Sequence, residues 1–264
     1  MRTVALALAL SLAALAQPVK VRVLPFKHQA PSAPLDLAIR RALRADLPTG
    51  PLEMWHGPAA SPSQVQDLPM VLWGRTWRYG SGHAVEAFLS VRKPRVGAGI
   101  WKVPLADGTT FSVDIPRTEI EFAPMVLGAD LAPLHPSEIA DYCGGLVRLF
   151  EHDWTGAAPL FQRVAANPRA PVAVRVDAHL YLAVVAEKTG GDSFPQVRQA
   201  YQLNPYSRIT LLYLCMSHLA ALSRGGPLLH HLSALSDIVA HNHVLFLPQD
   251  GWFDKLRKYL ARTG

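Results

Sequence analysis

Residues 70 to 91 read MVLWGRTWRYGSGHAVEAFLSV and contain two runs of β-type residues separated by Gly80, Ser81 and Gly82. Glycine supplies the positive φ angles that a tight hairpin requires, so the pattern predicts two antiparallel strands. Pairing Tyr79 with His83 would place one set of apolar side chains on a single face: Val71, Trp73, Trp77, Val85, Ala87, Leu89 and Val91. We expect this face to pack against a helix, and Arg75 would need a partner if it were buried there.

The sequence around this hairpin predicts further short elements. Apolar and polar residues alternate from Val19 to Val23, which indicates a half-buried strand. Apolar residues between Leu35 and Leu47 recur at helical spacing, with arginines on the other side. Three more strands are expected, at Leu52–Trp55, Ile100–Val103 and Thr110–Ile115, and the last two flank the turn signal Asp107-Gly108.

A family resemblance emerges from these elements. The first predicted strand ends in Val23-Leu-Pro-Phe26, a helix follows, and Val71-Leu-Trp-Gly-Arg75 leads into the glycine-containing hairpin. This order resembles the amino-terminal α/β domain of TolB and related periplasmic domains over about residues 19 to 105. The resemblance implies a binding and docking module. The chain departs from it in the proline-rich stretch from Pro48 to Pro62 and in lacking the propeller that follows in TolB.

The second half of the chain repeats at a fixed spacing. Leu146, Leu180 and Leu214 are 34 residues apart, and so are Ala166, Ala200 and Ala234. The segment Ala200-Tyr-Gln-Leu-Asn-Pro205 resembles the end of a tetratricopeptide repeat, in which a small residue lets two helices approach and proline ends the second. The repeats would be 140–173, 174–207 and 208–241, followed by an amphipathic capping helix from Gly251 to Arg262. An irregular helical bundle is the alternative, because Val239 stands where proline is expected.

The fold class that follows is a two-domain α+β protein. Residues 17–127 would form a small TolB-like α/β sandwich, and residues 137–264 an all-α, tetratricopeptide-like domain. Residues 1–16 have the features of a signal peptide: a positive charge at Arg2, an apolar run from Val4 to Leu15, and small residues at Ala14 and Ala16. We therefore expect cleavage near Ala16 and a periplasmic or extracellular protein with no transmembrane segment.

Charge and motifs constrain the function. The net charge is +6, and the positive surplus of the mature chain belongs to its first half. This surplus is modest and forms no clustered basic face, which argues against nucleic acid as a partner. The common nucleophile, phosphate-binding and zinc motifs are missing from the sequence, so no catalytic residue, metal ligand or cofactor is assigned. Several side chains of types that can bind a metal lie close together in the sequence: His230, His231, Asp237, His241 and His243. Their spacing matches no recognised set of metal ligands.

The favoured function is a non-enzymatic adaptor or scaffold that binds a protein partner in the cell envelope. Two alternatives stay open. One is a cell-wall or glycan-binding protein, in which Trp73, Trp77 and Trp101 would form an aromatic platform beside basic residues. The other is an enzyme with an unrecognised active site.

The tetratricopeptide resemblance also implies where a partner would bind. In that family the first helix of each repeat lines a groove, and the matching positions here include Arg148, Arg175, Leu182, Leu212 and Met216. The alternative is that the carboxy-terminal helix covers the apolar end through Trp252 and Phe253. Cys143 and Cys215 fall on the first helices of repeats one and three, so we expect them to be unpaired.

Overall fold

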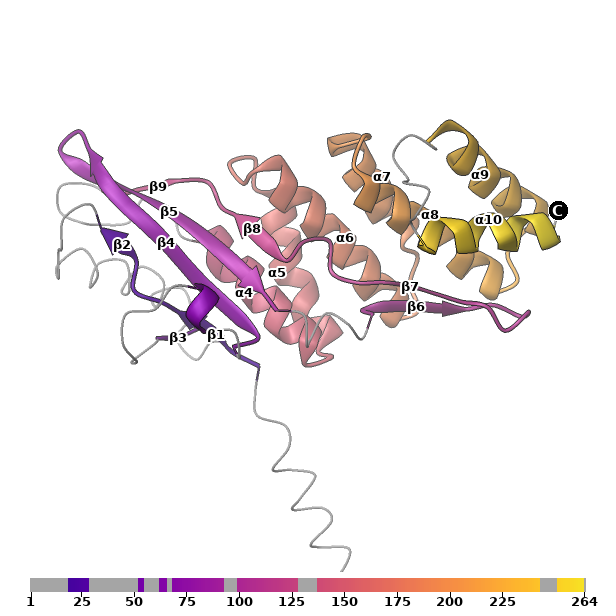
Figure 1. The fold of residues 1–264 in the computed structure, drawn as a ribbon, viewed down its shortest axis with the longest axis horizontal. Helices are drawn as coiled ribbons and strands as arrows, with labels where there is room; N and C mark the ends of the chain where they lie inside the picture. The colour runs from indigo at the N-terminus through magenta and orange to yellow at the C-terminus, as the bar shows by residue number, and fades with distance from the viewer. Residues whose placement is uncertain are drawn as a thin grey trace, which may run out of the picture.

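The computed structural model describes residues 19–28, 52–54, 62–65, 68–92, 99–127, 137–242 and 251–263. It has a small mixed sheet at one end, followed by helices that run in a row to the carboxyl terminus at the opposite end (Figure 1). Residues 1–16, where a signal peptide is expected, and the helix expected at 35–47 lie outside the described residues. Of the proline-rich stretch from 48 to 62, the structure describes 52–54 and Pro62. Within the described part of the chain, no helix combines the length and apolarity needed to cross a bilayer.

The sheet is mixed, and its central strand is β4 (Met70–Tyr79). The parallel strands β1 (Val21–Val23) and β3 (Leu52–Met54) extend the sheet on one side, and β2 (Lys27–His28) also pairs with β4. On the other side β4 forms an antiparallel hairpin with β5 (Gly82–Val91), which in turn pairs with β8 (Glu119–Glu121) and β9 (Met125–Leu127). A short 3₁₀ turn, η1 (Pro62–Gln64), precedes β4.

The predicted hairpin exists, but its predicted register is wrong by one residue. Tyr79 pairs with Gly82, so the loop has two residues, and Gly80 has a φ of +58°. A one-residue slip moves every side chain of one strand to the other face. Alternation could not fix the register because nearly all of β5 is buried, on both faces. The observed register also places Arg75 opposite Glu86, and the two form an ion pair.

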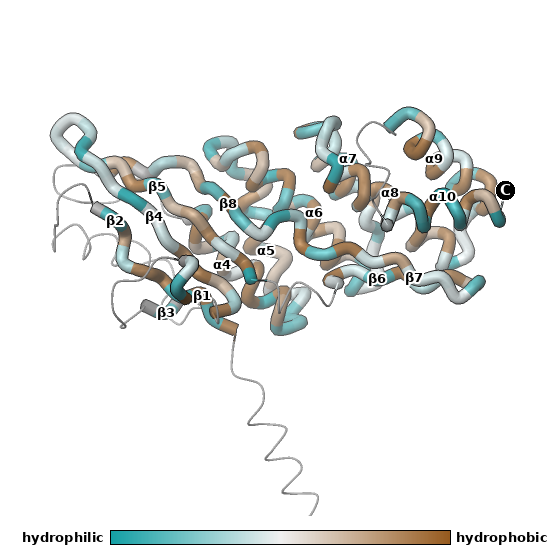
Figure 2. Tube along the Cα trace, in the orientation of Figure 1, coloured by the Kyte–Doolittle hydropathy of each residue, from teal (hydrophilic) through white to brown (hydrophobic). Residues whose placement is uncertain are grey.

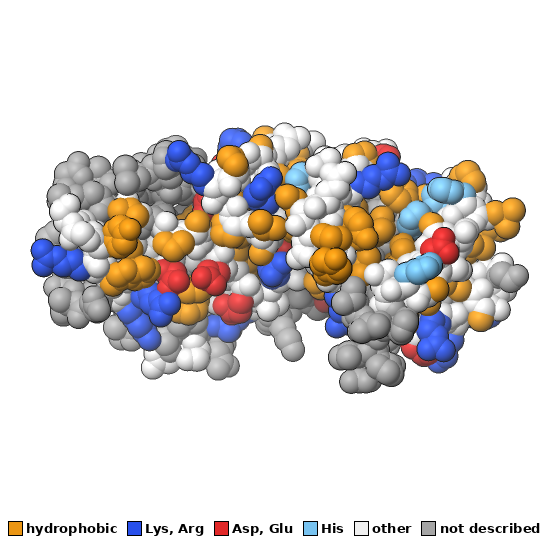
Figure 3. All heavy atoms as spheres, turned by 90° about the horizontal axis from the view of Figure 1, so that it is seen from above, with side chains coloured by type: hydrophobic (Ala, Val, Ile, Leu, Met, Phe, Trp, Pro, Cys, Tyr) orange, Lys and Arg blue, Asp and Glu red, His pale blue; other side chains and the backbone are white. Residues whose placement is uncertain are grey.

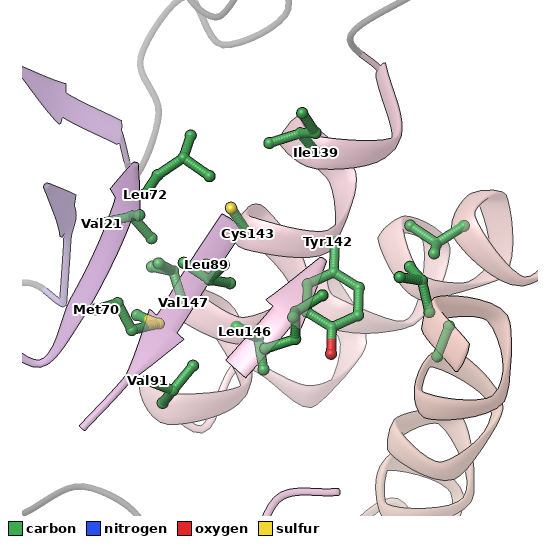
Figure 4. Packing of buried hydrophobic residues seen from close by; sticks show 14 of the residues in the cluster. Val21, Met70, Leu72, Leu89, Val91, Ile139, Tyr142, Cys143, Leu146 and Val147 are labelled. Carbon is green, nitrogen blue, oxygen red and sulfur yellow. The ribbon is translucent and has the colours of Figure 1, made fainter. Parts of the chain in front are cut away.

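Helix α4 (Ser137–Phe150) packs on one face of this sheet. Figure 4 shows side chains from the sheet, including Met70, Leu72 and Leu89, pointing toward Cys143 and Leu146 of the helix. The same buried cluster continues into α5 (Trp154–Ala166) and α6 (Val172–Lys188) through stacked and edge-on rings of Tyr142, Phe161 and Tyr181. We call this the sheet-end cluster.

The remaining helices continue the row: α7 (Phe194–Leu203), α8 (Arg208–Ser223), α9 (Leu228–His241) and α10 (Gly251–Thr263). Each helix from α4 to α9 packs on the next in sequence order. In Figure 2 the tube of α10 shows hydrophilic and hydrophobic residues in turn, and its apolar side chains Phe253, Leu256 and Tyr259 are buried. The expected amphipathic helix at the carboxyl terminus is therefore confirmed.

A separate hairpin, formed by β6 (Trp101–Pro104) and β7 (Thr110–Val113), lies against the helices. Trp101 meets Tyr213 of α8 edge-on, and Phe111 meets Trp252 and Tyr259 of α10 in the same manner. Together with apolar residues of α6 to α9 these side chains form the second core, the hairpin-end cluster. The hairpin precedes residue 127 in the sequence, yet it packs on helices that follow residue 137, so the two predicted segments share buried cores.

The two cysteines lie in different cores. Cys143 belongs to the sheet-end cluster and Cys215 to the hairpin-end cluster, and both are buried and free. The prediction that they are unpaired is confirmed.

Candidate functional site

Two residues of the predicted groove, Arg148 and Arg175, are engaged by their own chain. Arg148 forms an ion pair with Asp153, whose carboxylate also accepts a hydrogen bond from the Gly156 amide and caps α5. Arg175 donates from Nε to the carbonyl oxygen of Ala165, at 3.2 Å. Both arginines therefore stabilise helix ends, and reversing their charge would affect stability as well as any binding.

The apolar residues predicted for the groove are mostly covered. Leu182 is 6% exposed in the sheet-end cluster and Met216 is 0% exposed in the hairpin-end cluster. Leu212 is half-buried and packs with Leu211 and Phe253. The structure thus has the arrangement named as the alternative, in which α10 helps to cover this end. Leu182 and Met216 offer no surface to a partner.

The tryptophans of the predicted aromatic platform do not share one surface. Trp101 is buried in the hairpin-end cluster, whereas Trp73 lies in the main sheet. The Trp73 ring stacks on Phe88 at 4.6 Å, and its Nε1 donates to Ser90 Oγ at 2.9 Å. Ser90 Oγ in turn donates to Glu119 at 2.7 Å. Trp73 is thus held by the sheet, and a platform of all three tryptophans does not form.

A hollow between α7, α8 and α9 brings several ionisable side chains together. We call it the notch; its volume is about 400 Å³ and its lining consists of Asp192, Phe194, Pro195, Arg198, Leu214, His218, His230 and His231. Apolar side chains from α7 and α8 form part of the wall, and the cationic side chain of Arg198 is exposed. Figure 3 shows histidine side chains gathered on this face, over the helices of the carboxy-terminal part. Side chains from α7, α8 and α9 therefore meet here.

Two buried histidines face each other in the notch. The Nδ1 atoms of His218 and His231 are 3.0 Å apart, and the side chains are 8% and 7% exposed. Burial, together with the smaller effects of the nearby His231 and His230, lowers the pKa of His218 to about 4. Burial likewise lowers the pKa of His231. Both imidazoles are therefore neutral at pH 7, with one Nδ1 donating to the other.

The surrounding residues fix these rings. Phe194 packs edge-on against His218, with ring centroids 4.9 Å apart, and stacks on His231. Gly226 leaves room for the His231 ring, because a Cβ there would lie 2.9 Å from Nε2. Between the lining residues Asp192 and Phe194, the buried Ser193 donates to Glu187 at 2.7 Å and lies 2.9 Å from Ser217 Oγ of α8. Glu187 also forms an ion pair with Arg224 at the end of α8.

The structure divides the predicted histidine cluster. His230 and His231 line the notch, but Asp237 and His241 are exposed further along α9, where His241 bonds to the backbone carbonyl of Asp237. His243 lies outside the described residues. His218 was missed. Its sequence signal was the short α8–α9 turn, since helices joined in this way pack antiparallel and bring residue 218 beside residue 231.

A second polar feature lies between the two clusters. Asp177 of α6 is buried, and Arg117, from the segment between β7 and β8, donates from Nε to both carboxylate oxygens at 3.1 and 2.9 Å. The Tyr142 hydroxyl is 3.5 Å from the same carboxylate. Burial raises the pKa of Asp177 to about 7, against the opposing effect of the Arg117 charge. The Arg117–Asp177 ion pair thus links the segment between β7 and β8 to α6.

Comparison with known proteins adds no relative: no protein family, curated protein or solved structure matches this chain.

Proposed function

We propose that this chain is an exported, non-enzymatic adaptor that binds a segment of a protein partner in the cell envelope. The observation that carries the proposal is the notch, the hollow lined by residues of α7, α8 and α9. It combines apolar walls with one exposed cation, Arg198. Such a surface suits a peptide with an apolar anchor residue beside an acidic one, because charge complementarity favours a carboxylate near Arg198.

The architecture supports this proposal. Helices α4 and α5, α6 and α7, and α8 and α9 follow the boundaries of the 34-residue blocks, each as two helices joined by a short turn. We propose that they are tetratricopeptide-like repeats and that the sheet is a TolB-like module. Both kinds of module serve as binding surfaces in the families they resemble.

The test is a selection of displayed random peptides on the purified protein. We expect enrichment of sequences with an aromatic or aliphatic residue next to Asp or Glu. Arg198→Glu should abolish their capture, since the charge then repels the peptide. Arg169→Glu is the matched control, because Arg169 is also exposed but does not line the notch.

Other outcomes would count against the notch. Failure to enrich any peptide would argue against an adaptor of this kind. Equal capture by the Arg198→Glu and Arg169→Glu variants would place the binding site elsewhere. If folded Arg148→Glu and Arg175→Glu variants lost capture instead, the groove predicted from the repeats would be the binding site.

A further inference from the structure

We propose that His218, His230 and His231 bind one divalent transition-metal ion, of the Zn²⁺, Cu²⁺ and Ni²⁺ class, at the wall of the notch. This goes beyond the adaptor function and does not depend on it. Imidazole nitrogens suit these ions, which take two to four such ligands in proteins.

The distance between the facing nitrogens agrees with shared ligation. Nitrogens bind these ions at about 2.1 Å, so two of them at tetrahedral or right angles lie roughly 3.0 to 3.4 Å apart. The Nδ1 atoms of His218 and His231 are 3.0 Å apart. Gly226 and Phe194 hold the two rings so that these nitrogens face each other.

The third imidazole is close to both. Ring centroids are 5.0 Å apart for His230 and His231, 5.3 Å for His218 and His231, and 6.5 Å for His218 and His230. Three imidazoles around one ion would have centroids about 5 Å apart, given a metal–nitrogen bond of about 2.1 Å. Within the described part of the chain no three ligating groups already converge on one point. His230 is exposed in the first turn of α9, so rotation of its side chain can close the remaining gap.

Two charged side chains, Asp192 and Arg198, also line the notch. The Oδ1 atom of Asp192 accepts a hydrogen bond from the Phe194 amide at 3.0 Å, and the negative charge of this carboxylate favours a cation in the notch. The positive charge of Arg198 repels a bound cation, but this side chain is exposed and can turn toward solvent.

The test is calorimetric titration of the full chain, purified through a histidine-free tag, with Zn²⁺, Cu²⁺ and Ni²⁺ salts at pH 7.5. We expect one equivalent to bind, with a rise in the thermal midpoint. His231→Ala and His218→Ala should weaken binding by roughly 100-fold or more, and His230→Ala by at least about tenfold. The controls are His179→Ala, since His179 bonds to Gln196 on the neighbouring helix, and His241→Ala on the exposed part of α9.

A second readout separates ligation from a loss of folding. With Cu²⁺ bound, electron paramagnetic resonance should show nitrogen hyperfine splitting, which the exposed-site variant His230→Ala should reduce. Absence of stoichiometric binding, or equal binding by the notch variants and the two controls, would overturn the proposal and leave His218 and His231 as a hydrogen-bonded pair. No peptide is present in these titrations, so their failure leaves the adaptor proposal intact.

Discussion

The two buried clusters differ in what they enclose. The sheet-end cluster is filled with apolar and aromatic side chains, and its rings at Tyr142, Phe161 and Tyr181 pack on one another with almost no exposure. The hairpin-end cluster is bordered by buried polar groups, including Ser217, His218 and His231, and the notch opens at its edge. Polar contacts reinforce the first region as well, since the Tyr142 hydroxyl lies 3.5 Å from the Asp177 carboxylate that Arg117 binds. In the second region the buried histidines line an open hollow, and for this reason we propose a binding site in the carboxy-terminal half.

Helix α6 joins the two regions. Val174, Ala178 and Tyr181 enter the sheet-end cluster, while Val176, Leu180 and Val184 enter the hairpin-end cluster. A helix that is apolar on opposite sides is buried between two layers. The regions should therefore unfold together.

Truncation of a ring in either region should have the largest effect. Phe161→Ala and Phe111→Ala should each reduce the free energy of unfolding by about 3 to 5 kcal/mol, because each removes a fully buried ring and leaves a cavity. Urea unfolding followed by circular dichroism should show one transition for both variants. Leu229→Ala is the control, since Leu229 is 85% exposed, and it should change stability by less than about 0.5 kcal/mol. Two separate transitions would show that the regions are independent.

The pH dependence of stability tests the junction at Asp177. Its pKa is raised to about 7 in the folded protein, against about 3.9 when unfolded, so the folded state retains this proton more strongly. The resulting stability is fully present below about pH 4 and is lost as the pH rises toward 7, by about 1.4 kcal/mol per pKa unit. Between pH 5 and 8 the wild type should lose stability, and Asp177→Asn should have a flatter profile. A wild-type profile that does not fall would show that Arg117 keeps the carboxylate ionised.

Two glycines in equivalent positions, Gly191 after α6 and Gly226 after α8, allow the space at the two helix ends to be compared. Gly191 and Gly226 each donate a backbone hydrogen bond to the alanine carbonyl five residues earlier. A Cβ at Gly191 would meet ordinary contacts at 3.4 Å or more, whereas at Gly226 it would lie 2.9 Å from both Ala221 O and His231 Nε2. Gly226→Ala should therefore cost about 1 to 3 kcal/mol and displace His231, while Gly191→Ala should be nearly neutral. Thermal unfolding measures both, and equal effects would mean that the His231 ring is not confined.

Local patterns anticipated much of the fold. Alternation and glycines predicted β4 and β5, the 34-residue spacing predicted the helix pairs, and apolar spacing predicted α10. The register escaped prediction because β5 is buried on both faces, so neither pairing exposes apolar side chains. The packing of β6 and β7 on the helices was also not predicted, because it depends on Tyr213 and Trp252, which are more than 90 residues away in sequence.

The notch was not predicted as a site. The sequence showed His230 and His231 as neighbours but assigned them no role, and His218 lies beside them only through the packing of α8 on α9. Leu182 and Met216 were assigned to a groove because repeat spacing gives the helix position but not which neighbouring helix covers it. Burial is a property of the assembled layers, and a single sequence does not specify it.

The most direct test of the adaptor proposal is amide chemical-shift mapping of the protein with a selected peptide. We predict that the largest shifts fall on notch residues of α7 to α9, such as Arg198, Leu214 and His231, and disappear in the Arg198→Glu variant. Shifts centred on Arg148 and Arg175, with the notch unperturbed, would contradict the account.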